Sequence, residues 1–235
     1  MPAITIHELI NAGFHFGHRS SRWNPKMKPY IYAKKNSIHI IDLRETARGL
    51  LTACKFLSKL TSNGGSILFV GTKWQARKLV EGEAQRCEMA YISERWLGGT
   101  LTNFNTVRKS LKFLEEMEEK EESGATKEYS KKLLSSLNRK KKRIKKNLDG
   151  VRNMEKLPDV LVIIDPKKEH IAVEEANKLG IPTVSLSDTD SNPDAVDVCV
   201  PGNDDAIRSI KYFLETIVDA IIEGKATAAA LANAG

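Results

Sequence analysis

Gly71-Thr72-Lys73 is the segment whose composition most resembles a phosphate-binding loop. It follows an apolar run and opens a helical pattern, as such loops do in nucleotide enzymes. It lacks the long glycine-rich loop and the Lys-Ser/Thr order that cradle a nucleotide and chelate its magnesium ion. No G-x-G-x-x-G follows a predicted strand, and no G-x-S-x-G nucleophile turn is present. We therefore expect no enzymatic activity and no small-molecule substrate.

Two other segments carry side chains that could coordinate a metal ion. The segment DTDSNPD, which begins at Asp188, places oxygen atoms at alternate positions as a calcium loop does. However, Pro193 and Cys199 stand where that loop needs glycine and glutamate. His15 and His18 could ligate a metal if a distant carboxylate such as Asp188 completed the site. The simpler interpretation is that both histidines are hydrogen-bonding loop residues, so we predict no cofactor.

The strongest chemical signal is positive charge concentrated in two segments. Residues 139–146 read RKKKRIKK, and this basic octet, with seven basic side chains, equals the net charge of +7 of the whole chain. Residues 19–35 form an N-terminal cationic patch with six basic residues, no acidic residue, and interleaved Trp23, Tyr30 and Tyr32. Such concentrations of charge suit a polyanion, and aromatic rings among them suit stacking on unpaired bases. The alternatives are a solvated helical face for the octet and coverage of a core edge for the aromatics.

Residues 103–154 are predicted to form an arm of two helices folded back on each other. Apolar residues recur at spacings of three and four over 104–117 and again over 133–151. This gives each helix one narrow apolar stripe, which is sufficient for a paired seam. A break at Ser123, Gly124 and Ala125 predicts antiparallel pairing.

That pairing predicts where the charges of the arm lie. The glutamates between Glu115 and Glu122 would sit near the turn. Arg108, Lys109 and Lys112 would lie level with the basic octet. We therefore expect an arm with an acidic tip and a basic base.

The remainder of the chain alternates between short apolar runs and helical patterns. We predict strands at 37–41, 66–70, 90–93, 160–164, 183–186 and 196–200, and helices at about 5–12, 42–62, 74–86, 169–179 and 203–225. Residues 13–29 are expected to be irregular because glycine and proline interrupt them. Strands alternating with helices of this length predict a parallel sheet covered by helices on both faces.

Composition restricts the class of protein further. No apolar run reaches the roughly 18 residues of a membrane span, and MPAITIHELINAG contains no cationic-then-apolar secretion leader. We therefore expect a cytoplasmic chain without membrane partners. The three cysteines are widely spaced and are expected to be reduced thiols.

Several long blocks of this sequence resemble one known family. These are AGFHFGHRSSRWNPKMKPYIYAKKNSIHIIDLRET, FVGTKWQA, RWLGGTLTNFNTV, LPDVLVIID, ANKLGIPTVSLSDTDSNPD and VPGNDDAIRSI. In order and spacing they resemble the universal S-two family of the small ribosomal subunit, over about Thr5 to Glu223. The arm is similar to that of the bacterial and organellar branch, and the resemblance does not separate a bacterial from a plastid source. One departure is Asp190, where the family commonly has asparagine; an added carboxylate there would repel RNA phosphate.

The resemblance implies a structural ribosomal protein located on the small subunit. Its implied fold is a Rossmann-like or flavodoxin-like parallel sheet with helices on both faces, plus an inserted antiparallel coiled-coil hairpin. Its implied partners are small-subunit rRNA near the junction of head and body, neighbouring small-subunit proteins, and the large S-one protein. Two other functions stay open: a Rossmann-like nucleotide-dependent enzyme, and a protein-docking module with an acidic partner.

These inferences define domains and contact residues. We expect an α/β core with an N-terminal basic extension at 1–102 and 155–228, a coiled-coil arm at 103–154, and a flexible tail at 229–235. Trp96 is expected to fix the point where the arm leaves the core, and Gly98 and Gly99 are expected to supply the unusual backbone angles of that exit. The residues predicted to contact RNA are all basic: Arg19, Arg22, Lys26, Lys28, Arg95, Arg108, Lys109, Arg139, Lys140, Lys141, Lys142, Arg143, Lys145 and Lys146.

Overall fold

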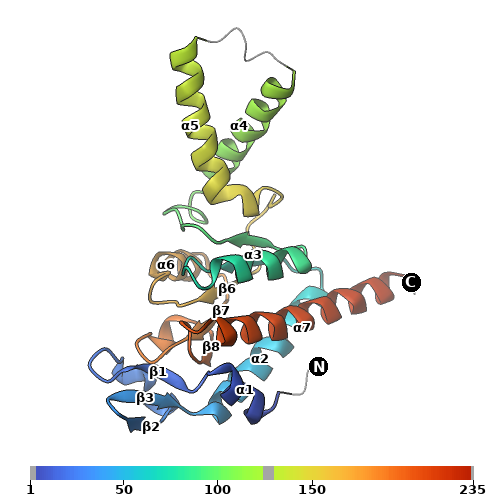
Figure 1. Ribbon diagram of the computed structural model, residues 1–235. Coiled ribbons are helices and arrows are strands. Elements are labelled where there is room, and N and C mark those ends of the chain that lie inside the picture. The colour runs from blue at the N-terminus through green and yellow to red at the C-terminus, as the bar shows by residue number, and fades with distance from the viewer. Residues whose placement is uncertain (1–3, 124–129, 234–235) are drawn as a thin grey trace.

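The computed structural model describes residues 4–123 and 130–233, and a parallel sheet forms its centre (Figure 1). The strands are β4 (Ile67–Val70), β5 (Ala90–Ile92), β6 (Val160–Ile164), β7 (Thr183–Ser187) and β8 (Val198–Pro201). They pair in the order β5-β4-β6-β7-β8. Counted along the chain from β4, this is the order 2-1-3-4-5 of flavodoxin-like sheets. The predicted Rossmann-like α/β core is confirmed.

Both faces of this sheet are covered because its strands are apolar on both sides. On one face, strand residues such as Phe69 and Val162 pack against four helices: α1 (Ile6–Ala12), α2 (Leu43–Ser62), α3 (Arg77–Arg86) and α7 (Ile207–Asn233). On the other face, Leu68 and Leu161 pack against α6 (His170–Leu179) and the base of the arm. The arm is therefore rooted in the core.

A second, antiparallel sheet corrects two sequence predictions. It contains β1 (Phe16–Arg19), β3 (Ile38–Ile41) and β2 (Ile31–Lys35) in that order, and the short helix η1 (Pro25–Tyr30) precedes β2. Residues 13–29 are thus not irregular throughout, and the strand predicted at 37–41 does not join the parallel sheet. The reason is a tight turn at Asn36 and Ser37, whose φ angles are 47° and 62°. Two positive φ angles suit a hairpin, whereas a parallel crossover needs a dozen or more residues.

Most helix ends follow local sequence signals; the start of α3 and the end of α7 do not. Thr5 forms the expected cap of α1, with Glu8 completing a capping box, and Asp42 caps α2. α3 begins at Arg77 rather than near Trp74, because a turn precedes it.

The last helix is longer than predicted. α7 passes the expected end near Lys225 and continues to Asn233, through an alanine-rich stretch with high helix propensity. Residues 229–233 of the predicted tail are helical, and 234–235 lie outside the described residues. None of the helices in residues 4–123 and 130–233 is apolar over a stretch long enough to cross a membrane.

The arm consists of α4 (Phe104–Glu122), α5 (Lys131–Leu148) and the short helix η3 (Asp149–Val151). α4 and α5 meet near the core and diverge toward their far ends (Figure 1). Buried seam residues are Val107, Leu111, Leu114 and Met117 on α4, and Ile144 and Leu148 on α5. Leu133, in the outer part of α5, is 47% exposed. A continuous coiled coil stays a prediction, and Gly124 and Ala125 of the predicted break lie outside the described residues.

The exit of the arm from the core is organised by the buried carboxylate of Glu175, on α6. Its Oε1 accepts hydrogen bonds from Trp96 Nε1 at 3.1 Å and Gly99 N at 2.8 Å. Its Oε2 accepts from Leu101 N, Thr102 N and Thr102 Oγ1, each at 3.0 Å. Burial alone would raise the pKa of Glu175, but these donors outweigh burial and lower it.

This geometry explains the tryptophan-glycine motif at residues 96–99. Trp96 is buried and bonded to α6, as expected of a residue that fixes the exit. Gly99 has a φ of 88°, a conformation that favours glycine. The expectation of an unusual angle at Gly98 is wrong, because Gly98 is not among the glycines with positive φ.

Replacing Glu175 by glutamine should destabilise the fold by about 3 kcal/mol, because one amide oxygen cannot serve five donors. In this chain that corresponds to a Tm lower by roughly 6–12 °C. Glu174→Gln, at an exposed neighbouring position, is the matched control and should leave the Tm unchanged.

The same pair of variants predicts a pH dependence. The folded pKa of Glu175 lies below its ordinary value of 4.5. Its stabilisation is therefore complete above that ordinary value and is lost as the pH falls through the folded pKa. The Tm difference between wild type and Glu175→Gln should shrink as the pH falls below 4.5; a constant difference would contradict the role of the ionised carboxylate.

Candidate nucleic-acid interface

The N-terminal cationic patch lies on the antiparallel sheet and η1. Arg19, Arg22 and Lys28 are exposed, and Lys26 Nζ lies 2.7 Å from an Asp194 carboxylate oxygen. The aromatic residues divide between two roles. Trp23 packs on His39 of the central strand β3, with ring centroids 5.0 Å apart, and so covers part of one face of this sheet. Tyr32 is 71% exposed.

The patch is held against the core by close backbone contacts of β1. A Cβ added to Gly17 would lie 2.6 Å from Thr189 Cγ2. The amide of His18 donates to Thr189 Oγ1 at 2.9 Å and to Asp188 Oδ1 at 3.2 Å. Asn24 N donates to the carbonyl of Thr189 at 2.8 Å. The segment DTDSNPD is therefore the docking site of the N-terminal sheet.

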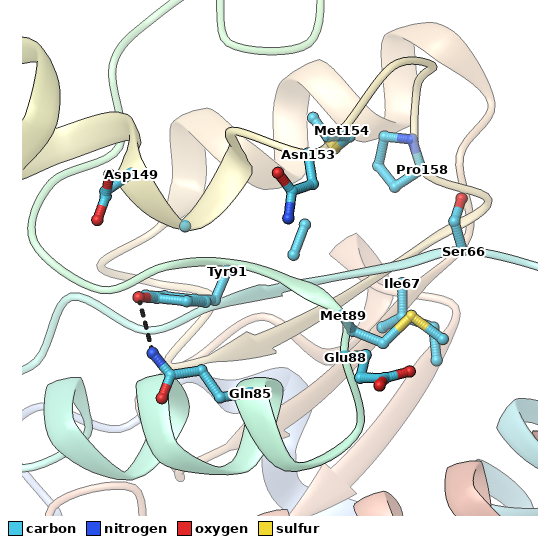
Figure 2. Close-up of a pocket in the computed structure, with 12 residues that line it drawn as sticks. Ser66, Ile67, Gln85, Glu88, Met89, Tyr91, Asp149, Asn153, Met154 and Pro158 are labelled. Atoms are coloured by element: carbon cyan, nitrogen blue, oxygen red, sulfur yellow. Dashed lines mark hydrogen bonds between the residues drawn. The ribbon is translucent and has the colours of Figure 1, made fainter. Parts of the chain in front are cut away.

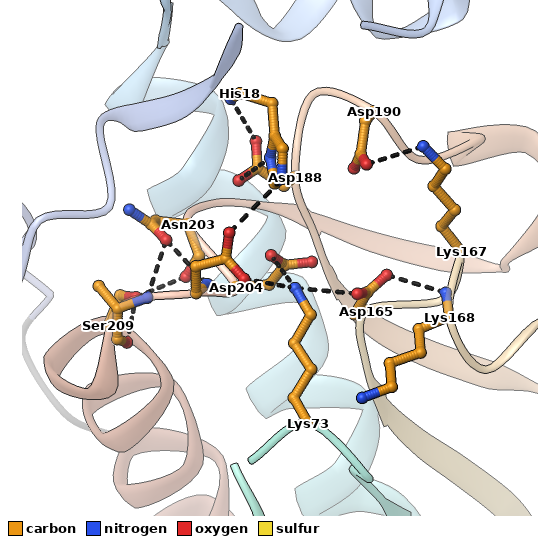
Figure 3. Close-up of polar contacts among 12 residues, drawn as sticks. His18, Lys73, Asp165, Lys167, Lys168, Asp188, Asp190, Asn203, Asp204 and Ser209 are labelled. Carbon is orange, nitrogen blue, oxygen red and sulfur yellow. Dashed lines mark hydrogen bonds and ion pairs between the residues drawn. The ribbon is translucent and has the colours of Figure 1, made fainter. Parts of the chain in front are cut away.

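The carboxyl ends of the parallel strands carry a network of aspartates that contact Lys73 and His18 (Figure 3). Lys73 Nζ lies 2.6 Å from Asp204 Oδ1, 2.8 Å from Asp205 Oδ1 and 2.9 Å from Asp165 Oδ2. His18 Nδ1 lies 2.8 Å from Asp188 Oδ2. Lys73, which in sequence suggests a phosphate loop, thus neutralises carboxylates of its own chain.

The protonation of this network follows from its burial and charge. The Asp188 carboxylate is the main cause that raises the pKa of His18 to about 9. Burial would lower the pKa of Lys73, yet Asp204 and its neighbours raise it, so Lys73 stays charged. Burial, together with the charge of Asp165, raises the pKa of Asp204. Six titratable groups thus share the position where a doubly wound sheet usually binds its ligand.

Three residues of the network could coordinate a metal ion. Ligand atoms of His18, Asp188 and Asp204 lie within 4.8 Å of one another. Asp204 Oδ2 is buried and has no hydrogen-bond partner among the described residues. The structure therefore brings together two of the three candidate ligands that the sequence offers, but with Asp204 in place of His15.

The added carboxylate of Asp190 does not face this interface as a free charge. Its side chain is 13% exposed, and Oδ2 lies 2.9 Å from Lys167 Nζ. The expected repulsion of phosphate by this residue is therefore reduced by an internal ion pair.

The register of the arm differs from the prediction. Lys141 Nζ contacts Glu121 Oε2, and Lys145 Nζ lies 3.7 Å from Glu118 Oε1. The basic octet is thus level with the acidic run of α4, and not with Arg108, Lys109 and Lys112. The reason is that α5 begins only at Lys131, so its residues face positions farther along α4 than a break at 123–125 implies.

This register divides the basic octet into two groups. The inner group, Lys141 and Lys145, pairs with glutamates, and Lys140 Nζ lies 4.0 Å above the ring centroid of Phe113. The outer face of α5 carries Arg139, Lys142, Arg143 and Lys146. Among the described residues, no ion pair involves Arg139, Lys142 or Arg143, whereas Lys146 lies 3.3 Å from Glu94. We call Arg139, Lys142 and Arg143 the outer arm face.

The three remaining predicted contact residues lie near the root of the arm. Arg95 and Lys109 are exposed. Arg108 instead donates to the carbonyls of Arg152 at 3.4 Å and Met154 at 3.2 Å. Arg108 therefore holds the returning chain against α4.

A cavity of about 510 Å³ separates the root of the arm from β5 and the end of α3 (Figure 2). Gln85, Tyr91, Asp149 and Met154 are among its lining residues. Gln85 Nε2 lies 3.4 Å from the Tyr91 hydroxyl. The lining combines amide, carboxylate and apolar groups without a basic side chain, so it does not extend the cationic surfaces.

Sequence reasoning missed the residues that organise these surfaces. Lys73 and Asp204 meet only in the folded chain, and their local patterns suggest a phosphate loop and a helix cap. Glu175 has a local signal: it stands three residues after buried Ala172, on the inward side of α6. A charged residue in an apolar stripe indicates a buried partner.

Substituting Gly17 by alanine should displace the N-terminal sheet, because the new methyl group would overlap Thr189. Amide exchange in β1 and β3 should increase, with much smaller change in the parallel sheet. Gly82→Ala provides the control, since an added Cβ there meets nothing within 4 Å. Equal exchange in Gly17→Ala and Gly82→Ala would contradict this docking contact.

Comparison with known proteins shows which family this sequence matches. The model of "Ribosomal protein S2" matches residues 9–224. Small ribosomal subunit protein uS2 of Rhodopirellula baltica is 55% identical over 220 residues, which cover 94% of this chain and 85% of that protein. Small ribosomal subunit proteins uS2c of Rhodomonas salina and Guillardia theta are 52% and 51% identical, over 95% and 94% of this chain and 92% and 94% of theirs. The chain belongs to the ribosomal protein S2 family.

Proposed function

We propose that this chain is a structural component of the small ribosomal subunit that binds small-subunit rRNA through two cationic surfaces. One is the N-terminal cationic patch, and the other is the outer arm face. The observation that carries the proposal is the division of the basic octet. Inner lysines neutralise glutamates of α4, and Arg139, Lys142 and Arg143 project outward without acidic partners among the described residues.

The charges on the outer arm face suit phosphate rather than base edges. Arg139, Lys142 and Arg143 recur at spacings that place them on one side of a helix. Neutralising phosphates releases counterions, which gives affinity that falls steeply with salt. Recognition by shape and phosphate position fits a surface without a base-reading module.

The core acts in this proposal as a rigid mount. Glu175 fixes the exit of the arm, and the contacts of His18 with Asp188 and Thr189 fix the N-terminal sheet. Both cationic surfaces are therefore attached to the same parallel sheet, and the arm projects from it as a coiled coil. We include in the proposal that the chain docks neighbouring small-subunit proteins, among them the large S-one protein. Contact near the junction of head and body belongs to the same proposal.

Of the two alternative functions, one is excluded and the other requires an experiment. A member of this family is a ribosomal protein, so the alternative of a nucleotide-dependent enzyme is excluded. The alternative of a docking module for an acidic protein is separated by nuclease treatment, because a protein contact survives digestion of RNA.

Two double variants with equal loss of charge test the proposal. Arg139→Gln with Lys142→Gln should weaken binding to protein-depleted small subunits and reduce the slope of log affinity against log salt by about one per lost phosphate contact. Lys141→Gln with Lys145→Gln removes inner charges and should change that slope less. Equal slopes for the two variants would contradict an RNA contact through the outer arm face.

A further inference from the structure

Trp74 is the most exposed large hydrophobic side chain among the described residues, at 77%. It lies in the turn between β4 and α3, at the carboxyl edge of the sheet. The turn is ordered by hydrogen bonds from Ala76 N and Arg77 N to the carbonyl of Lys73, at 2.9 and 3.0 Å. Trp74 is thus presented by a fixed backbone and adds little to the core.

α3 and α7 run alongside each other, and both begin near this position. Near the end of α3, Arg86 donates to Asp219 Oδ1 at 2.7 Å and to the carbonyl of Glu215 at 3.5 Å. Just before α7, Asp205 Oδ1 lies 2.8 Å from Nζ of Lys73, the residue that precedes Trp74, and Arg208 follows Asp205 by three residues. Lys78 follows Trp74 by four residues, in the first turn of α3. Lys78 and Arg208 are both exposed.

The exposed acidic side chain nearest in sequence to Arg208 is already engaged with other residues. Asp205 is exposed, but its Oδ1 lies 2.8 Å from Lys73 Nζ and its Oδ2 lies 3.5 Å from His18 Nε2. The N-termini of α3 and α7 add the positive ends of two helix dipoles. Within residues 4–123 and 130–233, neither Lys78 nor Arg208 takes part in an ion pair, so the surface combines an open aromatic ring with two unpaired cations.

We propose, resting on the RNA-binding function above, that Trp74 is a stacking platform for an unpaired nucleotide of the RNA. Lys78 and Arg208 hold the phosphates on either side of the stacked base. Aromatic rings beside cations bind single strands because every base has a π face. The basic octet differs, since the Phe113 ring beside it is covered by Lys140. The outer arm face thus offers phosphate contacts, and the Trp74 surface adds a platform for an unpaired base.

The test uses the full chain, Trp74→Phe and Trp74→Ala, with a single-stranded RNA of about twelve nucleotides and a duplex of equal length. The single strand should quench tryptophan fluorescence of the wild type, and the duplex should not. Trp74→Ala should weaken single-strand binding about tenfold. Trp74→Phe should retain most affinity while losing the quenching. Leu179→Ala, at a 42% exposed position elsewhere, should bind as wild type.

Equal single-strand affinity for wild type and Trp74→Ala, without quenching, would overturn the proposal. A photochemical crosslink from Trp74 to a protein of the assembled subunit, instead of to RNA, would also overturn it. The outer-face variant Arg139→Gln with Lys142→Gln separates the two levels of inference. If that variant loses binding to depleted subunits while Trp74→Ala retains it, rRNA binding stands and the stacking platform fails. If it binds as wild type, the proposed outer arm contact fails.

Discussion

Four aspartates share one end of the parallel sheet, and their neutralisation constrains the rest of this structure. Asp165, Asp204 and Asp205 surround the ammonium group of Lys73, and Asp188 contacts His18. Removing one partner of a buried ion pair costs about 3–5 kcal/mol, because the other charge is left uncompensated. The network therefore fixes the position of the segments that carry it. It also occupies the place where related folds bind a ligand.

The charges of the arm are arranged by a comparable constraint at its surface. Lys141 and Lys145 face α4 and pair with its glutamates. Exposed ion pairs contribute only about 0–1 kcal/mol each, so most of the packing comes from apolar residues such as Leu111, Leu114 and Ile144. The pairs nevertheless decide which cations are available to a partner. In this account, a sheet with no catalytic role holds two cationic surfaces in fixed positions.

Much of this fold could be predicted from local patterns, and the failures have identifiable physical causes. The apolar run at 160–164 predicts β6 because a strand buried on both faces must be apolar throughout. The same pattern at 37–41 also predicts a strand but does not say which sheet it joins. That choice depends on the two-residue turn at Asn36 and Ser37. The error in arm register arose because helix periodicity does not reveal how many residues connect two helices.

The candidate site was less predictable, because its groups come from distant parts of the sequence. Lys73 and Asp204 meet through the order of strands, which no local pattern encodes. The basic octet is visible by composition, yet its division into inner and outer groups requires the register of α4 and α5. Glu175 was partly predictable. Its spacing along the helix indicates that the side chain is buried, but does not reveal the five groups that donate hydrogen bonds to its carboxylate.

The central claim is that the outer arm face meets RNA while the inner lysines remain with α4. A structure of the small subunit containing this chain tests it most directly, through distances from basic nitrogen atoms to phosphate oxygen atoms. The account predicts Arg139, Lys142 and Arg143 within about 4 Å of rRNA phosphates, with Lys141 still against Glu121. An outer arm face turned toward solvent, with the RNA elsewhere, would contradict it.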